Sequence, residues 1–143
     1  MAEKQMPSFV LVDDDEEDRY FIRQALHQLG SSYPVVEFGN GIDFIDYLRQ
    51  ELADKGSEKV LWLVLMDIHM PEINGIEVLN TMHEHPLWQQ VPVIMFTTLP
   101  DQDKELIALG ASACIQKPLS VSELSQQMNT TFAPWLENPA VME

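Results

Sequence analysis

Short apolar runs alternate with amphipathic stretches along most of this chain. The runs are uninterrupted rather than alternating apolar and polar, which is typical of strands buried on both faces of a parallel sheet. Between them, apolar residues recur at helical spacing, as in Phe21, Ile22, Ala25, Leu26 and Leu29. Strands that alternate with helices predict an α/β fold, a doubly wound parallel sheet with helices on both faces. The predicted strands cover residues 9–12, 35–38, 61–66, 91–96 and 113–116.

Turn residues divide the predicted helices. The first helix ends before Gly30, and a polar loop at 54–59 follows the second. His85-Pro86 marks a break after the third helix, and the fourth ends at Leu109-Gly110. The last helix runs from Val121 to about Thr131 and leaves residues 133–143 as a tail. The apolar positions of the second and third helices are Ile42, Ile45, Leu48, Leu52, Ile76, Leu79 and Met82.

Four of the apolar runs stop at a residue that can handle phosphate or a metal. These residues are Asp13 with Asp14, Asp67, Thr97 and Lys117. Ligands of open α/β sheets bind at the carboxyl ends of the strands. We therefore expect three carboxylates, one hydroxyl and one ammonium to share a rim.

Such a rim needs a counter-charge. Two carboxylates about 4 Å apart repel by roughly 4 kcal/mol at an effective dielectric of 20. Lys117 can neutralise one unit of charge, and oxygen ligands favour Mg²⁺ for the rest. A carboxylate beside Mg²⁺, a lysine and a hydroxyl is also how proteins form an aspartyl-phosphate.

Size and charge restrict the function classes. The chain has 143 residues, which suits one domain. Its 8 basic and 23 acidic residues give a net charge of −15, which argues against nucleic acid or an anionic membrane as a partner. The single cysteine, Cys114, excludes an intramolecular disulfide, and neither a signal peptide nor a membrane span is recognisable. We expect a cytoplasmic protein.

Several segments resemble the receiver domains of two-component response regulators, of the stand-alone single-domain type. The resemblance covers nearly the whole chain, in the family's order and spacing. It implies a flavodoxin-like five-stranded sheet of order 2-1-3-4-5, with residues 1–143 as one receiver, a core of about 7–132 and no output domain. The matching segments are Leu11 to Asp14, Leu65 to Gly75, Pro92 to Thr97, Gly110-Ala111 and Lys117-Pro118.

The resemblance also implies roles for individual residues. Asp67 would be the phosphoacceptor, and Thr97 and Lys117 would contact the phosphoryl group. Mg²⁺ would be held by Asp14 directly, by Asp13 mainly through water, by Asp67, and by the backbone carbonyl of His69.

The same resemblance implies the partners. The phosphoryl group would come from the phosphohistidine of a sensor histidine kinase or phosphotransfer protein, and the signal would pass to a downstream protein target. Trp135 near the C-terminus could pack on its own domain or form a homodimer contact. No enzyme activity is expected beyond self-catalysed phosphotransfer and dephosphorylation.

Two departures from the family pattern stand out. Cys114 lies three residues before Lys117, where the family usually carries the aromatic residue of its conformational switch. The stretch from Thr97 to Gly110 is short for the family by about half of a 3.6-residue turn. The coupling from phosphorylation to output should therefore differ from the usual pattern.

Alternative readings remain open at this point. Residues 13–18 could be a solvated acidic helix start with Asp15 as the N-cap, and that reading stands for Glu16, Glu17 and Asp18. A phosphohydrolase could use Asp13-x-Asp15 as nucleophile and acid, with Asp101-x-Asp103 as a later acidic pair. The third alternative is a binding module that never takes phosphate.

Overall fold

A computed structural model describes residues 8–29, 33–55, 62–97, 103–116 and 120–137. These residues form one five-stranded parallel sheet of order β2-β1-β3-β4-β5. This order confirms the predicted flavodoxin-like fold. The strands are β1 (Ser8–Val12), β2 (Val35–Phe38), β3 (Trp62–Asp67), β4 (Val93–Thr97) and β5 (Ala113–Gln116).

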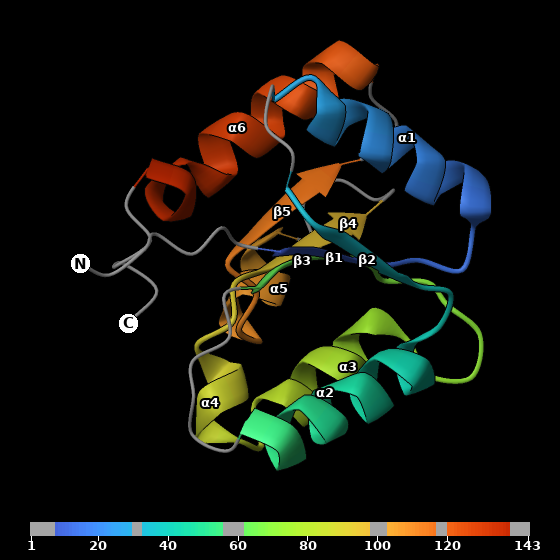
Figure 1. Cartoon of the computed structure of the whole chain (residues 1–143), viewed down its shortest axis with the longest axis vertical. Coiled ribbons are helices and arrows are strands. Elements are labelled where there is room, and N and C mark those ends of the chain that lie inside the picture. The colour runs from blue at the N-terminus through green and yellow to red at the C-terminus, as the bar shows by residue number, and fades with distance from the viewer. Residues whose placement is uncertain (1–7, 30–32, 56–61, 98–102, 117–119, 138–143) are drawn as a thin grey trace.

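Helices cover both faces of the sheet (Figure 1). The first and last helices, α1 and α6, lie on one face, and the helices between them lie on the other. None of the helices in the described ranges is long and apolar enough to cross a membrane. The helices are α1 (Glu16–His27), α2 (Gly41–Lys55), α3 (Gly75–Met82), α4 (Pro86–Gln89), α5 (Asp103–Ala108) and α6 (Val121–Glu137).

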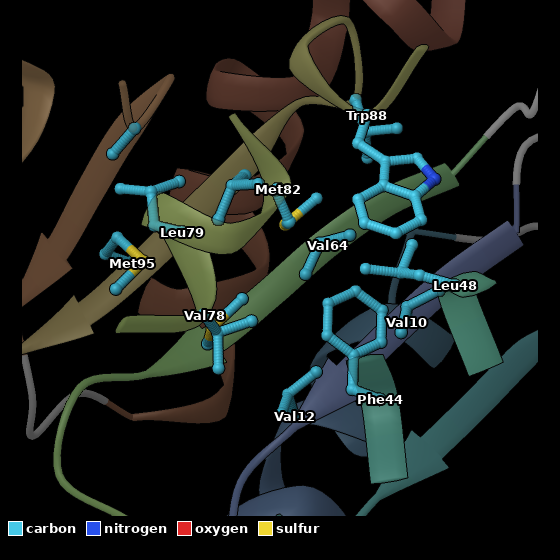
Figure 2. Close-up of a cluster of buried hydrophobic side chains, with 14 of the residues drawn as sticks. Val10, Val12, Phe44, Leu48, Val64, Val78, Leu79, Met82, Trp88 and Met95 are labelled. Atoms are coloured by element: carbon cyan, nitrogen blue, oxygen red, sulfur yellow. The ribbon is translucent and has the colours of Figure 1, made fainter. Parts of the chain in front are cut away.

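Each face of the sheet has its own hydrophobic core. Strand β1 shows the division, because successive side chains point to opposite faces: Val10 and Val12 belong to one core, and Phe9 and Leu11 to the other. All four are completely buried. Figure 2 shows the first core, where side chains of β1, β3 and β4 meet those of α2, α3 and α4.

Helix α4 was not predicted. The sequence pattern predicts a break at His85-Pro86, but Pro86 is the first residue of this helix. Proline is favourable at that position, because its φ is already helical and its missing N–H would have no partner within the helix. The His85 carbonyl accepts hydrogen bonds from the backbone N–H groups of Trp88 and Gln89, both at 3.0 Å. Trp88 then packs into the first core beside Leu48 and Val64 (Figure 2).

Two predicted helix ends were also wrong. Helix α2 continues to Lys55, into the predicted polar loop at 54–59. Helix α6 continues past Thr131 and Pro134 to Glu137, so the first residues of the predicted tail are helical. The apolar spacing explains the extension of α6, because Leu124, Met128 and Phe132 are each 0–1% exposed and face the second core.

The connection from β3 to α3 is tightly closed. The Gly75 N–H donates to the Ile68 carbonyl at 2.8 Å. A Cβ at Gly75 would overlap the carbonyl oxygen of Asp67 and lie 3.0 Å from the Ile68 Cα, so only glycine fits there. Asn74 is the N-cap of α3 and forms a capping box with Glu77. The end of β3 is therefore fixed by backbone contacts.

Replacing Phe132 with alanine should destabilise the protein by about 3–5 kcal/mol, because a buried ring is lost and a cavity is left behind. Phe132 packs edge-on against Phe9, with ring centroids 5.3 Å apart. The measurement is urea unfolding, with Gln127→Ala on the exposed side of α6 as the control. Equal unfolding midpoints for the two variants would show that this end of α6 contributes nothing to the core.

Replacing Gly75 with alanine should destabilise by about 1–3 kcal/mol, because the added methyl group forces the α3 backbone away from Asp67. Gly39→Ala is the matched control, since a Cβ there would meet its nearest atom, Arg19 Nη1, at an ordinary 3.6 Å. Thermal unfolding of both variants measures the difference. A Gly75→Ala protein as stable as Gly39→Ala would contradict the close approach.

Candidate functional site

Three acidic side chains meet at the carboxyl ends of two neighbouring strands. Asp13 and Asp14 follow β1, and Asp67 is the last residue of β3. The register pairs Val12 with Met66, which brings Asp13 level with Asp67. One carboxylate oxygen from each of the three aspartates lies within 4.8 Å of the others. Within the described ranges, this is the one group of three or more acidic, histidine or cysteine side chains placed to share a metal.

The three aspartates differ in exposure. Asp13 is 2% exposed, Asp67 is half-buried and Asp14 is exposed. A reagent in solution can therefore reach Asp14 and Asp67, whereas Asp13 lies beneath them. The site presents one buried and two accessible carboxylates.

Asp13 is fixed through both its backbone and its side chain. Its N–H donates to the Phe38 carbonyl of β2 at 3.1 Å. Its Oδ1 accepts from the Asp15 N–H at 2.9 Å, and its backbone carbonyl accepts from the Arg19 guanidinium. These contacts hold the turn between β1 and α1 in one conformation.

The acidic residues after Asp14 have a structural role. Asp15 is the N-cap of α1 and accepts from the Glu17 N–H at 2.9 Å. Glu16, Glu17 and Asp18 form the first turn, where negative charge favours the helix dipole. The helix-start reading is thus confirmed for these residues. None of them belongs to the acidic cluster.

Thr97 ends β4 at the same edge of the sheet. It is 4% exposed and pairs in register with Gln116, the residue before Lys117. Cys114 is partly buried, pairs in register with Met95 and packs against the first core. The position where the resemblance implies an aromatic thus holds a small side chain.

The structure does not describe every residue that was predicted to form the site. Lys117, Pro118 and Asp101 lie outside the described residues, as does the side chain of Trp135. His69 is described, and its side chain is exposed two residues beyond Asp67. The site is therefore built here from Asp13, Asp14, Asp67 and Thr97.

Sequence reasoning missed two residues that shape this edge. Arg19 binds the Asp13 carbonyl, and the only sequence signal is a basic residue directly after an acidic run. Glu72, in the loop after β3, has a φ of 68°, a left-handed conformation rare outside glycine. A glutamate in the sequence does not indicate that conformation.

The arrangement suits a hard cation. Three carboxylates this close repel one another, and oxygen ligands at the ends of buried strands match the preference of Mg²⁺ for carboxylates, carbonyls and water. Asp13, Asp14 and Asp67 could hold such an ion, which would offset their charge. A hydroxyl at the same edge, from Thr97, adds a donor for an anionic ligand.

Known proteins share both the sequence pattern and the fold. The family model described as the response regulator receiver domain matches residues 9–129. The polar-differentiation response regulator DivK of Brucella anthropi is 31% identical over 116 residues, covering 80% of this chain and 86% of DivK. A probable methanogenesis regulatory protein, FilR2 of Methanothrix harundinacea, is 26% identical over 129 residues, covering 89% of this chain and 82% of FilR2.

Solved structures agree with this family. A response regulator receiver domain from Rhodospirillum rubrum superimposes with a TM-score of 0.76 at 26% identity, over 88% of this chain and 93% of that one. The phosphorylated cyanobacterial phytochrome response regulator RcpA superimposes with a TM-score of 0.73 at 25% identity, over 94% and 96% of the two chains. With its sheet order and its strand-end acidic cluster, this chain belongs to the response regulator receiver domain family of two-component systems.

Proposed function

We propose that this receiver domain accepts a phosphoryl group on Asp67 from the phosphohistidine of a sensor kinase or phosphotransfer protein. The observation that carries the proposal is the acidic cluster of Asp13, Asp14 and Asp67 at the ends of β1 and β3. Asp67 is the accessible carboxylate that ends a buried strand, and the backbone contacts of Gly75 fix the chain next to it.

The transfer step needs only positioning and charge. A carboxylate oxygen of Asp67 forms a bond to phosphorus while the bond between phosphorus and the donor imidazole nitrogen breaks. The electron pair of that bond stays on the imidazole, which becomes neutral or takes up a proton from solvent. Phosphoryl transfer is catalysed mainly by alignment and by stabilisation of charge on the phosphoryl oxygens.

Other residues would align the phosphoryl group and stabilise its charge. Asp13, Asp14, Asp67 and the backbone carbonyl of His69 would hold Mg²⁺, which neutralises charge on the transferring group when bound. The Thr97 hydroxyl donates a hydrogen bond to a phosphoryl oxygen. Lys117, which lies outside the described residues, would supply a positive charge to the same oxygens.

The proposed output is protein contact rather than turnover of a substrate. The protein is a signalling phosphoacceptor, and its only chemistry is its own phosphorylation and dephosphorylation. The net charge of −15 favours partners with basic surfaces, and a second copy of this chain is one further candidate. The phosphorylated state of RcpA supports the proposal. Because a sensor-kinase donor would deliver its phosphoryl group on the cytoplasmic side, the proposed localisation is cytoplasmic.

Incubation with acetyl phosphate and Mg²⁺ should add one phosphoryl group to the protein, and Asp67→Asn should abolish that addition, because an amide is not a nucleophile for phosphorus. Intact-mass spectrometry measures the gain. Asp46→Asn, an exposed aspartate on α2, is the control and should be modified like the wild type.

Each contrary result favours a different function. A mass gain in Asp67→Asn would remove Asp67 from the central role. Turnover of a small phosphoester that survives Asp67→Asn but not Asp13→Asn would favour a phosphohydrolase. A wild-type protein that neither gains mass nor binds beryllofluoride with Mg²⁺ present would be a binding module that never takes phosphate.

Mg²⁺ at about a hundred times its Kd should stabilise the wild type by about 2.7 kcal/mol, because only the folded chain gathers the ligands. Asp14→Asn should lose most of this gain, since it removes a ligand. Without Mg²⁺ this variant should be at least as stable as the wild type, because one repelling charge is gone. Differential scanning calorimetry measures both effects.

Glu17→Gln is the matched control for this prediction. It removes a negative charge four residues from Asp13 and three residues from Asp14 without touching the cluster itself. Its Mg²⁺-dependent stabilisation should equal that of the wild type. An equal loss in Glu17→Gln and Asp14→Asn would mean that Mg²⁺ acts only through general charge screening.

A further inference from the structure

We infer that Arg19 is a positioning residue of the phosphoacceptor site, which holds the backbone between Asp13 and Asp14 so that both carboxylates face the metal and phosphoryl group. The inference rests on the proposed function, because it assigns Arg19 a task in that same site. Arg19 itself lies on α1 and is not a member of the acidic cluster.

Arg19 connects three elements of the fold. Its Nη1 donates to the backbone carbonyl of Asp13, at the end of β1. Its Nε donates to Glu37 Oε1 of β2 at 3.0 Å. The guanidinium thus ties α1 to the ends of β1 and β2, and its side chain is only 17% exposed.

The Asp13 carbonyl is the informative partner. This oxygen belongs to the peptide unit that links Asp13 to Asp14, and a peptide unit is planar and rigid. Fixing its orientation therefore limits the directions in which both side chains can leave the backbone. The other side of Asp13 is already held, because its N–H donates to the Phe38 carbonyl at 3.1 Å.

Charge gives a second reason for an arginine at this position. The acidic cluster and the first turn of α1 crowd negative groups around the same loop, and Arg19 places a permanent positive charge beside it. A guanidinium has five donors in a rigid fork and can serve two acceptors at once. A lysine ammonium on a flexible stem lacks that fixed fork, so it should replace Arg19 only in part.

The same surface supplies a matched control. Arg23 lies one turn further along α1 and pairs with Glu37 Oε1 at 2.6 Å, so it shares the carboxylate that holds Arg19. Its side chain is 34% exposed and also lies over the Tyr20 ring, 5.6 Å from the centroid. Removing Arg23 deletes a cation and an ion pair of α1 while leaving the Arg19 bond to Asp13.

The experiment is Mg²⁺ titration of the unphosphorylated full chain by isothermal calorimetry. We expect Arg19→Gln to weaken Mg²⁺ binding about tenfold, the lower end of the loss seen when a residue that orients metal ligands is removed. Arg19→Lys should recover part of this affinity. Arg23→Gln should bind Mg²⁺ within about twofold of the wild type, since screened surface charges contribute little.

A second readout separates positioning from loss of charge. Amide hydrogen exchange at Asp14 and Asp15 should accelerate in Arg19→Gln and stay unchanged in Arg23→Gln, because only the first variant releases the loop. Glu37→Gln should show a smaller change in the same direction. It also provides the test if Arg19→Gln fails to fold.

The outcomes distinguish this inference from the proposed function. Equal Mg²⁺ affinity and equal exchange in Arg19→Gln and Arg23→Gln would overturn the role of Arg19 and leave phosphorylation of Asp67 untouched. A wild type that binds Mg²⁺ but gains no mass from acetyl phosphate would overturn the proposed function alone. A wild type that binds no Mg²⁺ would overturn both.

Discussion

Mutual repulsion among three carboxylates is the constraint on which this structure depends. Asp13, Asp14 and Asp67 place one oxygen each within 4.8 Å of the others. Like charges this close repel one another, most strongly where burial limits screening by water, as at Asp13. Arg19 beside the loop offsets part of this repulsion, and the fold holds the groups together against the remainder. It does so by ending two fully buried, paired strands at the same level, which makes the positions of Asp13 and Asp67 a consequence of the sheet.

The two faces of the sheet restrain this edge by different means. On the side of α1 the restraint is electrostatic, because Arg19 donates to the Asp13 carbonyl and is itself paired with Glu37 of β2. On the side of α3, close backbone approach does it, because Gly75 lies against the carbonyl of Asp67 with no room for a Cβ. One restraint depends on a long side chain and is sensitive to charge, whereas the other is steric. These contacts restrain the ends of β1 and β3 from both faces of the sheet.

Much of this could be predicted from the sequence, and the reason is physical. A buried parallel strand needs an uninterrupted apolar run, so these runs predicted the strands of the sheet. The polar residues at the ends of the runs predicted Asp13, Asp67 and Thr97 as site residues. What escaped prediction depends on contacts between distant residues. Helix α4 forms because Pro86 is favourable at its first position and Trp88 packs into the core. The bond from Arg19 to the Asp13 carbonyl has no sequence signature, because any backbone carbonyl is a potential acceptor.

Cys114 restricts how the proposed phosphorylation of Asp67 could be coupled to the rest of the fold. A switch in a packed core requires a side chain with two distinct packing sites, since close-packed interiors move between discrete arrangements. A thiol has one heavy atom beyond Cβ and cannot span two such sites, so a rotating aromatic is not available to this chain on β5. The neighbour in register is Met95, whose methyl group lies near Gly75 beside Asp67. The side chain packed beside Gly75 is thus a flexible thioether, which adapts to its surroundings more readily than an aromatic ring. The proposed phosphorylation must then be coupled to the output surface by a group other than an aromatic side chain on β5.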